Sequence, residues 1–149
     1  MQIVAIKEKQ LVGLSARTKN ADEQDKTSAK IPALWKKFYG DIYRGQSEDN
    51  AYGIYSDYES DHSGIYKVSA AVEQGREKTG ENGLEELVIQ EGRYMVFSTD
   101  ELESPSVWGL WELAWKYFSS ADSEYQRAYT TDFELFYPDK RTELYIAIE

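Results

Sequence analysis

The spacing of apolar residues at the start of the chain predicts a β-hairpin. Residues 2–7 and 10–17 have the apolar content of short strands, and Glu8 and Lys9 form a polar turn between them. The next segment, residues 20–26, is charged and has no apolar period, so we expect it to be a loop.

Beyond residue 30 the apolar positions take on the period of a helix. Those at helical spacing are Ile31, Leu34, Trp35, Phe38 and Ile42. Pro32 suits the first turn of this helix, because a first-turn residue needs no backbone N–H donor. Residues 45–50 are expected to end the helix. Strands at 52–56 and 66–73, joined by the acidic turn 57–64, form a second predicted hairpin.

The same order of elements recurs after a hydrophilic connector with three glycines, residues 75–83. Ser104 is a candidate N-cap and Pro105 a candidate first-turn residue for the second helix. That helix is apolar over almost its whole circumference, so we expect part of its surface to face something other than the sheet. The elements predicted in this half are strands at 85–90 and 93–98, the helix at 106–118, and a closing hairpin of strands at 132–137 and 143–148.

Two short matches indicate that the second half duplicates the first. Residues 35–38 and 115–118 both read W-K-x-F, and Gly53 aligns with Glu134 one residue further on. We therefore predict an α+β fold built as a tandem pseudo-repeat of β-hairpin–helix–β-hairpin units, with a ligand cleft between the halves. The predicted divisions of one domain over residues 1–149 are pseudo-repeat one at about 1–75, a linker at about 75–84 and pseudo-repeat two at about 85–149.

The composition is that of a folded protein. Of 149 residues, 41% are hydrophobic and 14% are aromatic, which excludes disorder. There is no cysteine, which excludes disulfides, thiolate metal sites and thiol nucleophiles. The chain has no long apolar run and its beginning lacks the apolar core of a signal peptide, so we expect a cytoplasmic protein without a membrane segment.

The net charge of −10, from 27 acidic and 17 basic residues, argues against nucleic-acid binding. Phosphate recognition needs a basic cluster, and the sequence has none, so no direct nucleic-acid contact is expected. An acidic surface attracts positively charged ligands or partners over long range, although acidity also simply keeps a protein soluble.

Glu134 is the main candidate for a functional residue. In a strand, side chains alternate between faces, so Glu134 and Phe136 point one way while Phe133 and Leu135 point the other. A half-buried acid beside aromatic rings finds a hydrogen-bond partner, changes its protonation or binds a cation. A surface carboxylate, or one satisfied by Arg127 or by a tyrosine hydroxyl, is the alternative interpretation.

Aromatic residues supply the other ligand-binding candidates. Trp108 lies off the stripe that the other aromatic residues of its helix form, so it is expected at the cleft. Tyr55 and Phe136 are paired by the repeat and are expected on opposite walls. Trp35 and Trp115 also match in the repeat and are assigned to the structural core. The full set of candidates beside Glu134 is Trp108, Phe136, Tyr55, Tyr52, Tyr94 and Trp111.

No metal or cofactor site is expected. The segment that begins at Asp57 has the acidic residues Asp57, Glu59 and Asp61 at the spacing of a calcium-binding loop. Such a loop needs glycine at its sixth position and glutamate at its twelfth, whereas here glycine falls at the eighth and Val68 stands at the twelfth. The single histidine, His62, cannot form a zinc site alone.

Four motifs stand out in the chain: IPALW at 31–35, YGIY at 52–55, YESD at 58–61 and DFE at 132–134. Together they resemble the GyrI-like, or AraC-type, effector-binding domains. The most similar branch is the stand-alone bacterial proteins of integron gene cassettes, described as predicted transcription regulators. The resemblance covers nearly the whole chain. It implies a duplicated α+β unit of the SHS2 type, with a cleft between the halves for small, often cationic and aromatic, molecules.

The resemblance also implies a role for Glu134. In the drug-sensing relatives an acidic residue at the base of the cleft pairs with the positive charge of the ligand among aromatic rings, and Glu134 matches that glutamate. Relatives that are fused to DNA-binding helices carry an additional domain. This chain has no room for one, so direct gene regulation is not expected.

Three functions follow as hypotheses. The first is an effector-binding protein, monomeric or homodimeric, that binds a cationic or amphipathic small molecule and has a drug-sensing or transcription-related role. The alternative is a hydrolase of reactive electrophilic small molecules, an activity of some relatives, with Glu134 as base and a cleft tyrosine as acid. The third is an acidic inhibitor of a DNA-associated enzyme such as a topoisomerase, for which the negative charge is the only support.

Overall fold

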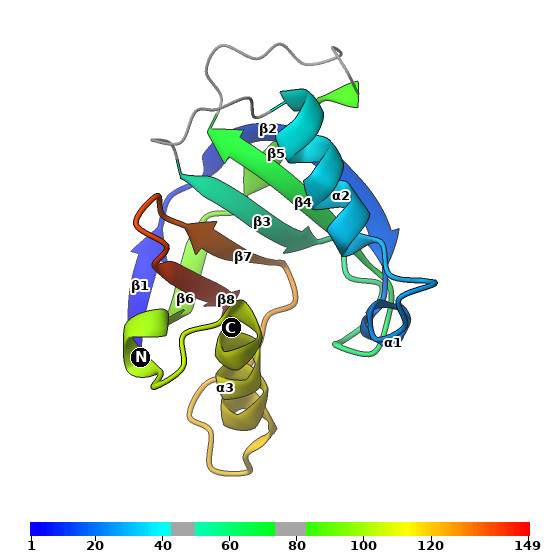
Figure 1. Cartoon of the computed structure of the whole chain (residues 1–149). Helices are drawn as coiled ribbons and strands as arrows, with labels where there is room; N and C mark the ends of the chain where they lie inside the picture. Colours follow the sequence, from blue (N-terminus) through cyan, green and yellow to red (C-terminus); the bar gives the residue numbers. More distant parts are fainter. Residues whose placement is uncertain (43–49, 74–82) are drawn as a thin grey trace.

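One antiparallel sheet forms the centre of the fold. The computed structural model describes residues 1–42, 50–73 and 83–149. Within them, eight strands pair in the order β1-β6-β8-β7-β3-β4-β2-β5 (Figure 1). The strands are β1 (Gln2–Ile6), β2 (Lys9–Thr18), β3 (Ala51–Ser56), β4 (Tyr66–Glu73), β5 (Glu85–Ile89), β6 (Gly92–Ser98), β7 (Thr131–Phe136) and β8 (Thr142–Ala147).

Helices occupy the positions at which the apolar period predicts them. They are α2 (Ile31–Lys37), which continues as a π-helical turn at Phe38–Ile42, and α3 (Val107–Ser119), with a 3-10 turn at Thr99–Glu101 after β6. The predicted N-cap of the second helix is wrong by two residues. Ser106, not Ser104, caps α3, because its Oγ accepts a hydrogen bond of 2.9 Å from the backbone N–H of Gly109.

The segment 20–26, predicted as a loop, begins with the one-turn helix α1 (Asn20–Glu23). This turn brings the Glu23 carboxylate to the start of α2, where it accepts hydrogen bonds from the backbone N–H groups of Lys30 (2.9 Å) and Ile31 (3.0 Å). Because Glu23 satisfies donors that have no partner inside the helix, a polar segment without an apolar period still has a defined structure.

The first hairpin predicted in each half does not form. Strand β1 pairs with β6 instead of β2, and β5 pairs with β2 instead of β6. Each first strand therefore crosses to the other half, where it covers an otherwise unpaired strand edge. The second hairpin of each half is confirmed, because β3 pairs with β4 and β7 pairs with β8.

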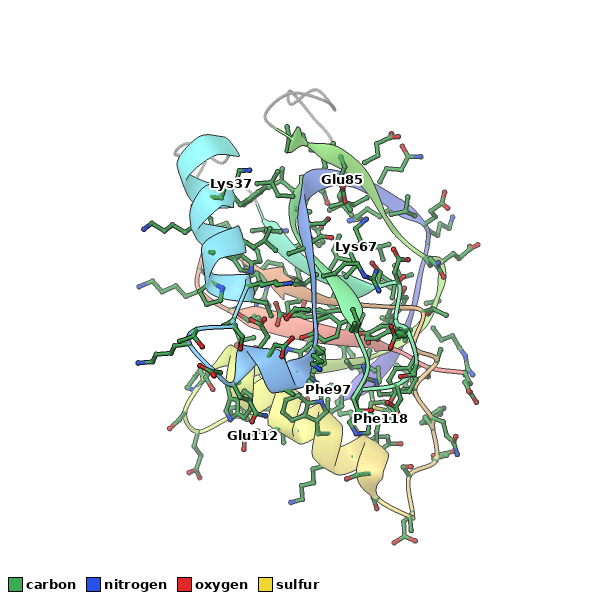
Figure 2. The ribbon with its side chains drawn as sticks, turned by 90° about the vertical axis from the view of Figure 1, so that its right-hand side faces the viewer. Lys37, Lys67, Glu85, Phe97, Glu112 and Phe118 are labelled. Atoms are coloured by element: carbon green, nitrogen blue, oxygen red, sulfur yellow. The ribbon has the colours of Figure 1, made fainter. Side chains whose placement is uncertain are left out.

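Side-chain contacts reinforce this exchange of strands. Lys67 of β4 and Glu85 of β5, both labelled in Figure 2, form an ion pair of 2.8 Å across the intervening strand β2. Ser15 of β2 donates a hydrogen bond to the same carboxylate. The first strand of the second half is thus fixed to the first half by side chains as well as by its backbone.

The two faces of the sheet bury different sets of residues. On one face α2 packs against β2 and β4, and α3 packs against β6 and β8. On the other face Phe133 and Leu135 of β7 join Leu87 and Ile89 of β5 in an apolar core. Since side chains alternate along a strand, Glu134 lies on the helix-covered face, and the predicted alternation of β7 is confirmed.

Two further predictions fall mostly on residues that are not described. The end of the first helix was expected at 45–50 and the connector at 75–83, whereas residues 43–49 and 74–82 lie outside the described part of the chain.

Candidate functional site

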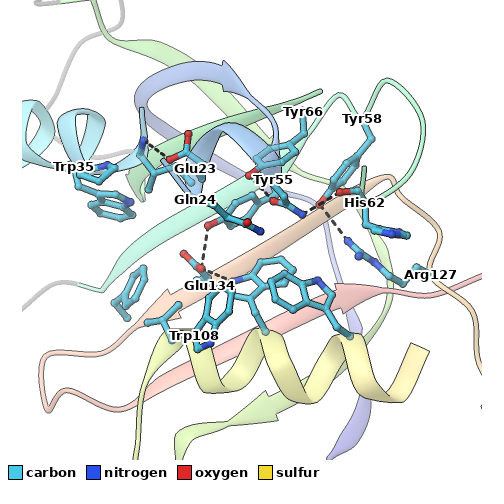
Figure 3. A pocket seen from close by; sticks show the side chains of 17 residues that line it. Glu23, Gln24, Trp35, Tyr55, Tyr58, His62, Tyr66, Trp108, Arg127 and Glu134 are labelled. Atoms are coloured by element: carbon cyan, nitrogen blue, oxygen red, sulfur yellow. Dashed lines mark hydrogen bonds between the residues drawn. The ribbon is translucent and has the colours of Figure 1, made fainter. Parts of the chain in front are cut away.

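A cavity of about 800 Å³ lies between α2 and α3, above the central strands β3 and β7 (Figure 3). Its walls are mainly aromatic. All four tryptophans of the chain line it, namely Trp35 from α2 and Trp108, Trp111 and Trp115 from α3. The circumference of α3 is apolar because one side of this helix packs on the sheet and another faces the cavity.

Glu134 of β7 lies at the floor of this cavity with only 3% of its surface exposed. One carboxylate oxygen, Oε2, accepts hydrogen bonds from the indole N–H of Trp111 at 2.7 Å and from the hydroxyl of Tyr55 at 3.0 Å (Figure 3). The other oxygen, Oε1, receives no hydrogen bond from any described residue. The carboxylate thus has one oxygen with two hydrogen bonds and one without any from the described residues.

Burial controls the protonation of this group. It raises the pKa of Glu134 to about 7, and the hydrogen bonds from Trp111 and Tyr55 oppose that rise. Burial and the nearby carboxylate also raise the pKa of Tyr55 well above its ordinary value, so its hydroxyl keeps its proton and donates. Near neutral pH the Glu134 carboxyl group is therefore close to the midpoint of its titration.

Gly53 makes room for the glutamate. The β3–β7 register places Gly53 directly opposite Glu134. A Cβ atom on residue 53 would lie 2.4 Å from Glu134 Oε1 and 3.3 Å from the ring of Trp35. Gly53 and Glu134, which the predicted repeat aligns in sequence, are thus also neighbours in space. The absence of a side chain at residue 53 permits the observed position of the carboxylate.

The second acidic residue on the cavity wall, Glu23, is fully used in capping α2. Its oxygens accept from the backbone N–H groups of Lys30 and Ile31, and from the hydroxyl of Thr18. Of these two carboxylates, Glu134 alone has an oxygen without a hydrogen bond from the described residues.

Arg127 also lines the cavity but does not pair with Glu134. Its Nη2 donates to Oδ2 of the fully buried Asp132 at 2.7 Å, and Tyr58 donates to the same oxygen. The backbone N–H of Ala147 donates to Asp132 Oδ1 at 2.8 Å. The sequence suggests two partners for Glu134, Arg127 and a tyrosine hydroxyl. Arg127 pairs with Asp132 instead, and the hydroxyl of Tyr55 donates a hydrogen bond to Glu134.

The structure brings five of the seven sequence-predicted site residues to the cavity: Glu134, Trp108, Phe136, Tyr55 and Trp111. Trp108 is 58% exposed, which places it at the rim. Phe136 meets the ring of Trp35 edge to face at a centroid distance of 5.5 Å.

Tyr52 and Tyr94 lie on the opposite face of the sheet, in the core that contains Phe133. The hydroxyl of Tyr52 donates to Glu73, and that of Tyr94 donates to the backbone oxygen of Gln90. Tyr52 is an odd number of residues from Tyr55 along β3, so strand alternation sends the two side chains to different faces.

Several residues of the cavity wall differ from the ligand-binding candidates predicted from the sequence. Trp35 and Trp115 were assigned to the structural core, yet both line the cavity. Tyr58, Tyr66 and Arg127 were not named as ligand-binding candidates. For the tryptophans, the W-K-x-F match was the signal, because two matched helices that flank one cleft place equivalent residues on its two walls.

The family assignment rests on the whole chain. The family model of the GyrI-like small molecule binding domain matches residues 1–149. The chain belongs to the GyrI-like family. No curated protein matches it in sequence.

Several solved structures are similar to this GyrI-like domain. An integron cassette protein from the mobile metagenome of Vibrio cholerae is 33% identical, with a TM-score of 0.82 over 99% of this chain and 95% of that chain. Two others share the fold. SAV2435, solved bound to tetraphenylphosphonium, is 16% identical with a TM-score of 0.68 over 99% of this chain and 93% of its own. A candidate transcription regulation protein from Staphylococcus aureus MU50 is 15% identical with a TM-score of 0.68 over 99% of this chain and 97% of its own.

Among the described residues, no group of three or more histidine, cysteine or acidic side chains is arranged to hold a metal ion. No described helix has the length and apolar character needed to span a bilayer.

Proposed function

We propose that this GyrI-like domain binds amphipathic organic cations with aromatic rings in the cavity between α2 and α3, with Glu134 as counter-ion. The observation that supports this most directly is the buried Glu134 carboxylate with one oxygen free of hydrogen bonds from the described residues, at the floor of a cavity lined by four tryptophans. SAV2435, which shares the fold, was solved with the aromatic cation tetraphenylphosphonium.

The physical basis is electrostatic attraction where water is scarce. A carboxylate attracts a cation far more strongly in a buried, low-dielectric site than in water. Each ring face that contacts the cation adds about 0.5–2 kcal/mol. The net charge of −10 also favours the approach of cations from solution.

We further propose that the two halves of the chain are copies of one unit, with the cavity at their junction. The element order β-β-α-β-β occurs twice, with α1 and the 3-10 turn as additions. The central strands β3 and β7 occupy equivalent places in the two halves and pair with each other. In this proposal the first copy supplies Gly53 and the second copy supplies Glu134 to a single binding site.

The test compares two ions of nearly equal shape and opposite charge. Because all four tryptophans line the cavity, their fluorescence reports directly on its occupation. Tetraphenylphosphonium is expected to quench this fluorescence with saturation, whereas tetraphenylborate is not. In Glu134→Gln the preference for the cation over the anion should fall at least about tenfold, because the counter-ion is lost. Equal binding of both ions by the wild-type protein would contradict the proposal.

A second candidate is hydrolysis of reactive electrophilic small molecules. It is favoured by the pKa of Glu134, which is raised to about 7 and therefore suits a general base near neutral pH. The Tyr55 hydroxyl, 3.0 Å from Glu134, is the candidate acid. Turnover of an electrophilic substrate that disappears in Glu134→Gln, while the substrate still binds, would favour this function over binding alone.

The remaining properties inferred from sequence stay predictions. These are a cytoplasmic location, a monomeric or homodimeric state, no direct contact with nucleic acid, and a drug-sensing or transcription-related role. Gel filtration at several protein concentrations tests the monomeric or homodimeric state.

A further inference from the structure

The cavity has a second polar end that the proposed function does not use. Arg127 lies on its wall next to Tyr58 and His62, at the end away from Trp35, with Glu134 between them (Figure 3). The side chain of Arg127 is only 6% exposed. A buried guanidinium on the wall of a ligand cavity needs an explanation, because such groups are rarely left with unused donors.

The hydrogen bonds of Arg127 use only part of its capacity. Nη2 donates to Asp132 Oδ2 at 2.7 Å and to the Tyr58 hydroxyl at 3.5 Å. Neither Nε nor Nη1 makes a hydrogen bond to any described residue. Because Nε is fully buried, Nη1 is the nitrogen whose donors a ligand in the cavity can reach. A guanidinium carries five N–H donors in a rigid planar arrangement, so most of its donors are left over here.

The charge of Arg127 is already balanced. Asp132 is fully buried and forms an ion pair with it, so the pair as a whole is close to neutral. The rings of Tyr129 and Tyr58 stand 4.3 Å and 5.9 Å from the guanidinium carbon and hold the group in place. What this end of the cavity offers a ligand is therefore a fixed hydrogen-bond donor rather than a net positive charge.

We propose that Arg127 is a second anchor of the cavity, donating a hydrogen bond to an uncharged acceptor oxygen of the ligand. This rests on the proposed function and deepens it. The preferred ligands are aromatic cations that carry a carbonyl-type oxygen at the end opposite the positive charge. An anionic group suits this end less well, because the carboxylate of Asp132 already balances the charge of Arg127.

The distance between the two anchors, Glu134 and Arg127, can be compared with the length of a ligand. Arg127 Nη2 lies 2.7 Å from the carboxylate of Asp132, and Asp132 is two residues from Glu134 on β7, a separation of about 7 Å between Cα atoms in a strand. A benzyl group with a substituent in the para position spans a similar distance. A triphenylphosphonium cation bearing such a benzyl group can therefore place its charge near Glu134 and its substituent near Arg127.

The experiment compares two ligands of nearly equal shape at pH 8, namely para-acetylbenzyl and para-isopropylbenzyl triphenylphosphonium, by tryptophan fluorescence. The acetyl compound has an acceptor oxygen, and the isopropyl compound is more apolar. Hydrophobic burial alone favours the isopropyl compound. We expect the wild-type protein to bind the acetyl compound about fivefold more tightly, the size of one added hydrogen bond. Equal or tighter binding of the isopropyl compound would overturn the proposal.

A double variant tests the assignment to Arg127. Arg127→Met with Asp132→Asn removes the donor without leaving a buried charge unpaired. Its circular dichroism and Tm establish that it is folded, and the preference for the acetyl compound should then disappear. Persistence of the preference would refute the role of Arg127. Should the variant not fold, the comparison of ligands on the wild-type protein decides the matter alone.

Two further outcomes separate this inference from the proposed function. If neither phosphonium compound binds, or if Glu134→Gln binds both as tightly as wild type, the proposed function fails. If both bind in a Glu134-dependent way with no acetyl preference, only the second anchor fails. A para-carboxybenzyl analogue should bind more weakly than the acetyl compound, and tighter binding would overturn the choice of an uncharged acceptor.

Discussion

Glu134 and Gly53 face each other across β7 and β3, and a Cβ atom at position 53 would lie 2.4 Å from the Glu134 carboxylate. The position of the Glu134 carboxylate, whose Oε1 has no hydrogen bond from the described residues, is therefore set by a residue that has no side chain. This relationship makes the glycine part of the site, although it cannot touch a ligand through a side chain of its own.

Substitution of this glycine should displace the glutamate. In Gly53→Ala the new methyl group pushes the carboxylate away from its observed position and loosens its hydrogen bonds to Trp111 and Tyr55. We expect the affinity for tetraphenylphosphonium to fall about tenfold and the free energy of unfolding to fall by about 1–3 kcal/mol, as for other overpacked sites. Calorimetric titration and urea unfolding measure the two effects.

Gly40 provides a matched control. A Cβ atom at that position would meet nothing within 4 Å, and the residue lies on the exposed side of the helix end. Gly40→Ala should leave both quantities nearly unchanged. Equal effects of the two substitutions would mean that the close approach at Gly53 has no special role.

The pH dependence of stability should reveal the buried carboxyl group. Burial raises the pKa of Glu134 from 4.5 to about 7 in the folded protein. Because the folded state holds the proton more tightly, this contribution to stability is fully present below about pH 4.5 and is lost as the pH rises through about 7. The loss amounts to about 3 kcal/mol in the free energy of unfolding.

Glu134→Gln isolates this effect, because the amide does not titrate. Urea unfolding of both proteins between pH 5 and pH 8 is the measurement, and the change in their difference reports Glu134 alone. The free energy of unfolding of Glu134→Gln should increase relative to that of the wild type as the pH rises. Parallel curves for the two proteins would show that Glu134 titrates near its ordinary value.

Local periodicity accounts for the elements that the sequence predicted well. Alternation along residues 132–137 placed Glu134 and Phe136 on one face and Phe133 on the other, as observed. The helical period likewise located α2 and α3. These properties depend only on neighbours in the chain, so they can be read from the residue pattern.

Pairing between distant strands could not be read in the same way. Residues 2–7 and 10–17 look like a hairpin, but β1 pairs with β6 because the edge that it covers belongs to the other half. The roles of Gly53 and Arg127 also depend on this long-range strand pairing, so the local residue pattern does not indicate them.

Strand alternation at β3 excludes one of the two tyrosines predicted at the cleft. Tyr52 and Tyr55 were both proposed for the cleft, yet three residues along a strand separate opposite faces. Alternation alone would have shown that only one of them lines the cleft. Gly53, which shares a face with Tyr55, was instead the informative neighbour.

Trp111 should lower the pKa of the Glu134 carboxyl group. Its indole N–H donates to Glu134 at 2.7 Å and thereby lowers the pKa of that carboxyl group against the effect of burial. In Trp111→Phe we expect the pH midpoint of tetraphenylphosphonium binding to rise by about one unit, because a hydrogen bond to the charged form is lost. Calorimetric titrations over a pH series measure it. Trp115→Phe is the control, since Trp115 also lines the cavity but gives no hydrogen bond to Glu134.

The buried ion pair of Arg127 and Asp132 should matter far more to stability than an exposed one. Asp132→Ala leaves the arginine, only 6% exposed, without its counter-ion, so we expect a loss of about 3–5 kcal/mol in the free energy of unfolding. Lys9→Ala breaks a pair with Glu73 in which both side chains are largely exposed, and should cost less than about 1 kcal/mol. Urea unfolding of both variants at one pH is the measurement. Similar losses in the two variants would mean that solvent reaches Arg127 and that the far end of the cavity is more open than its burial indicates.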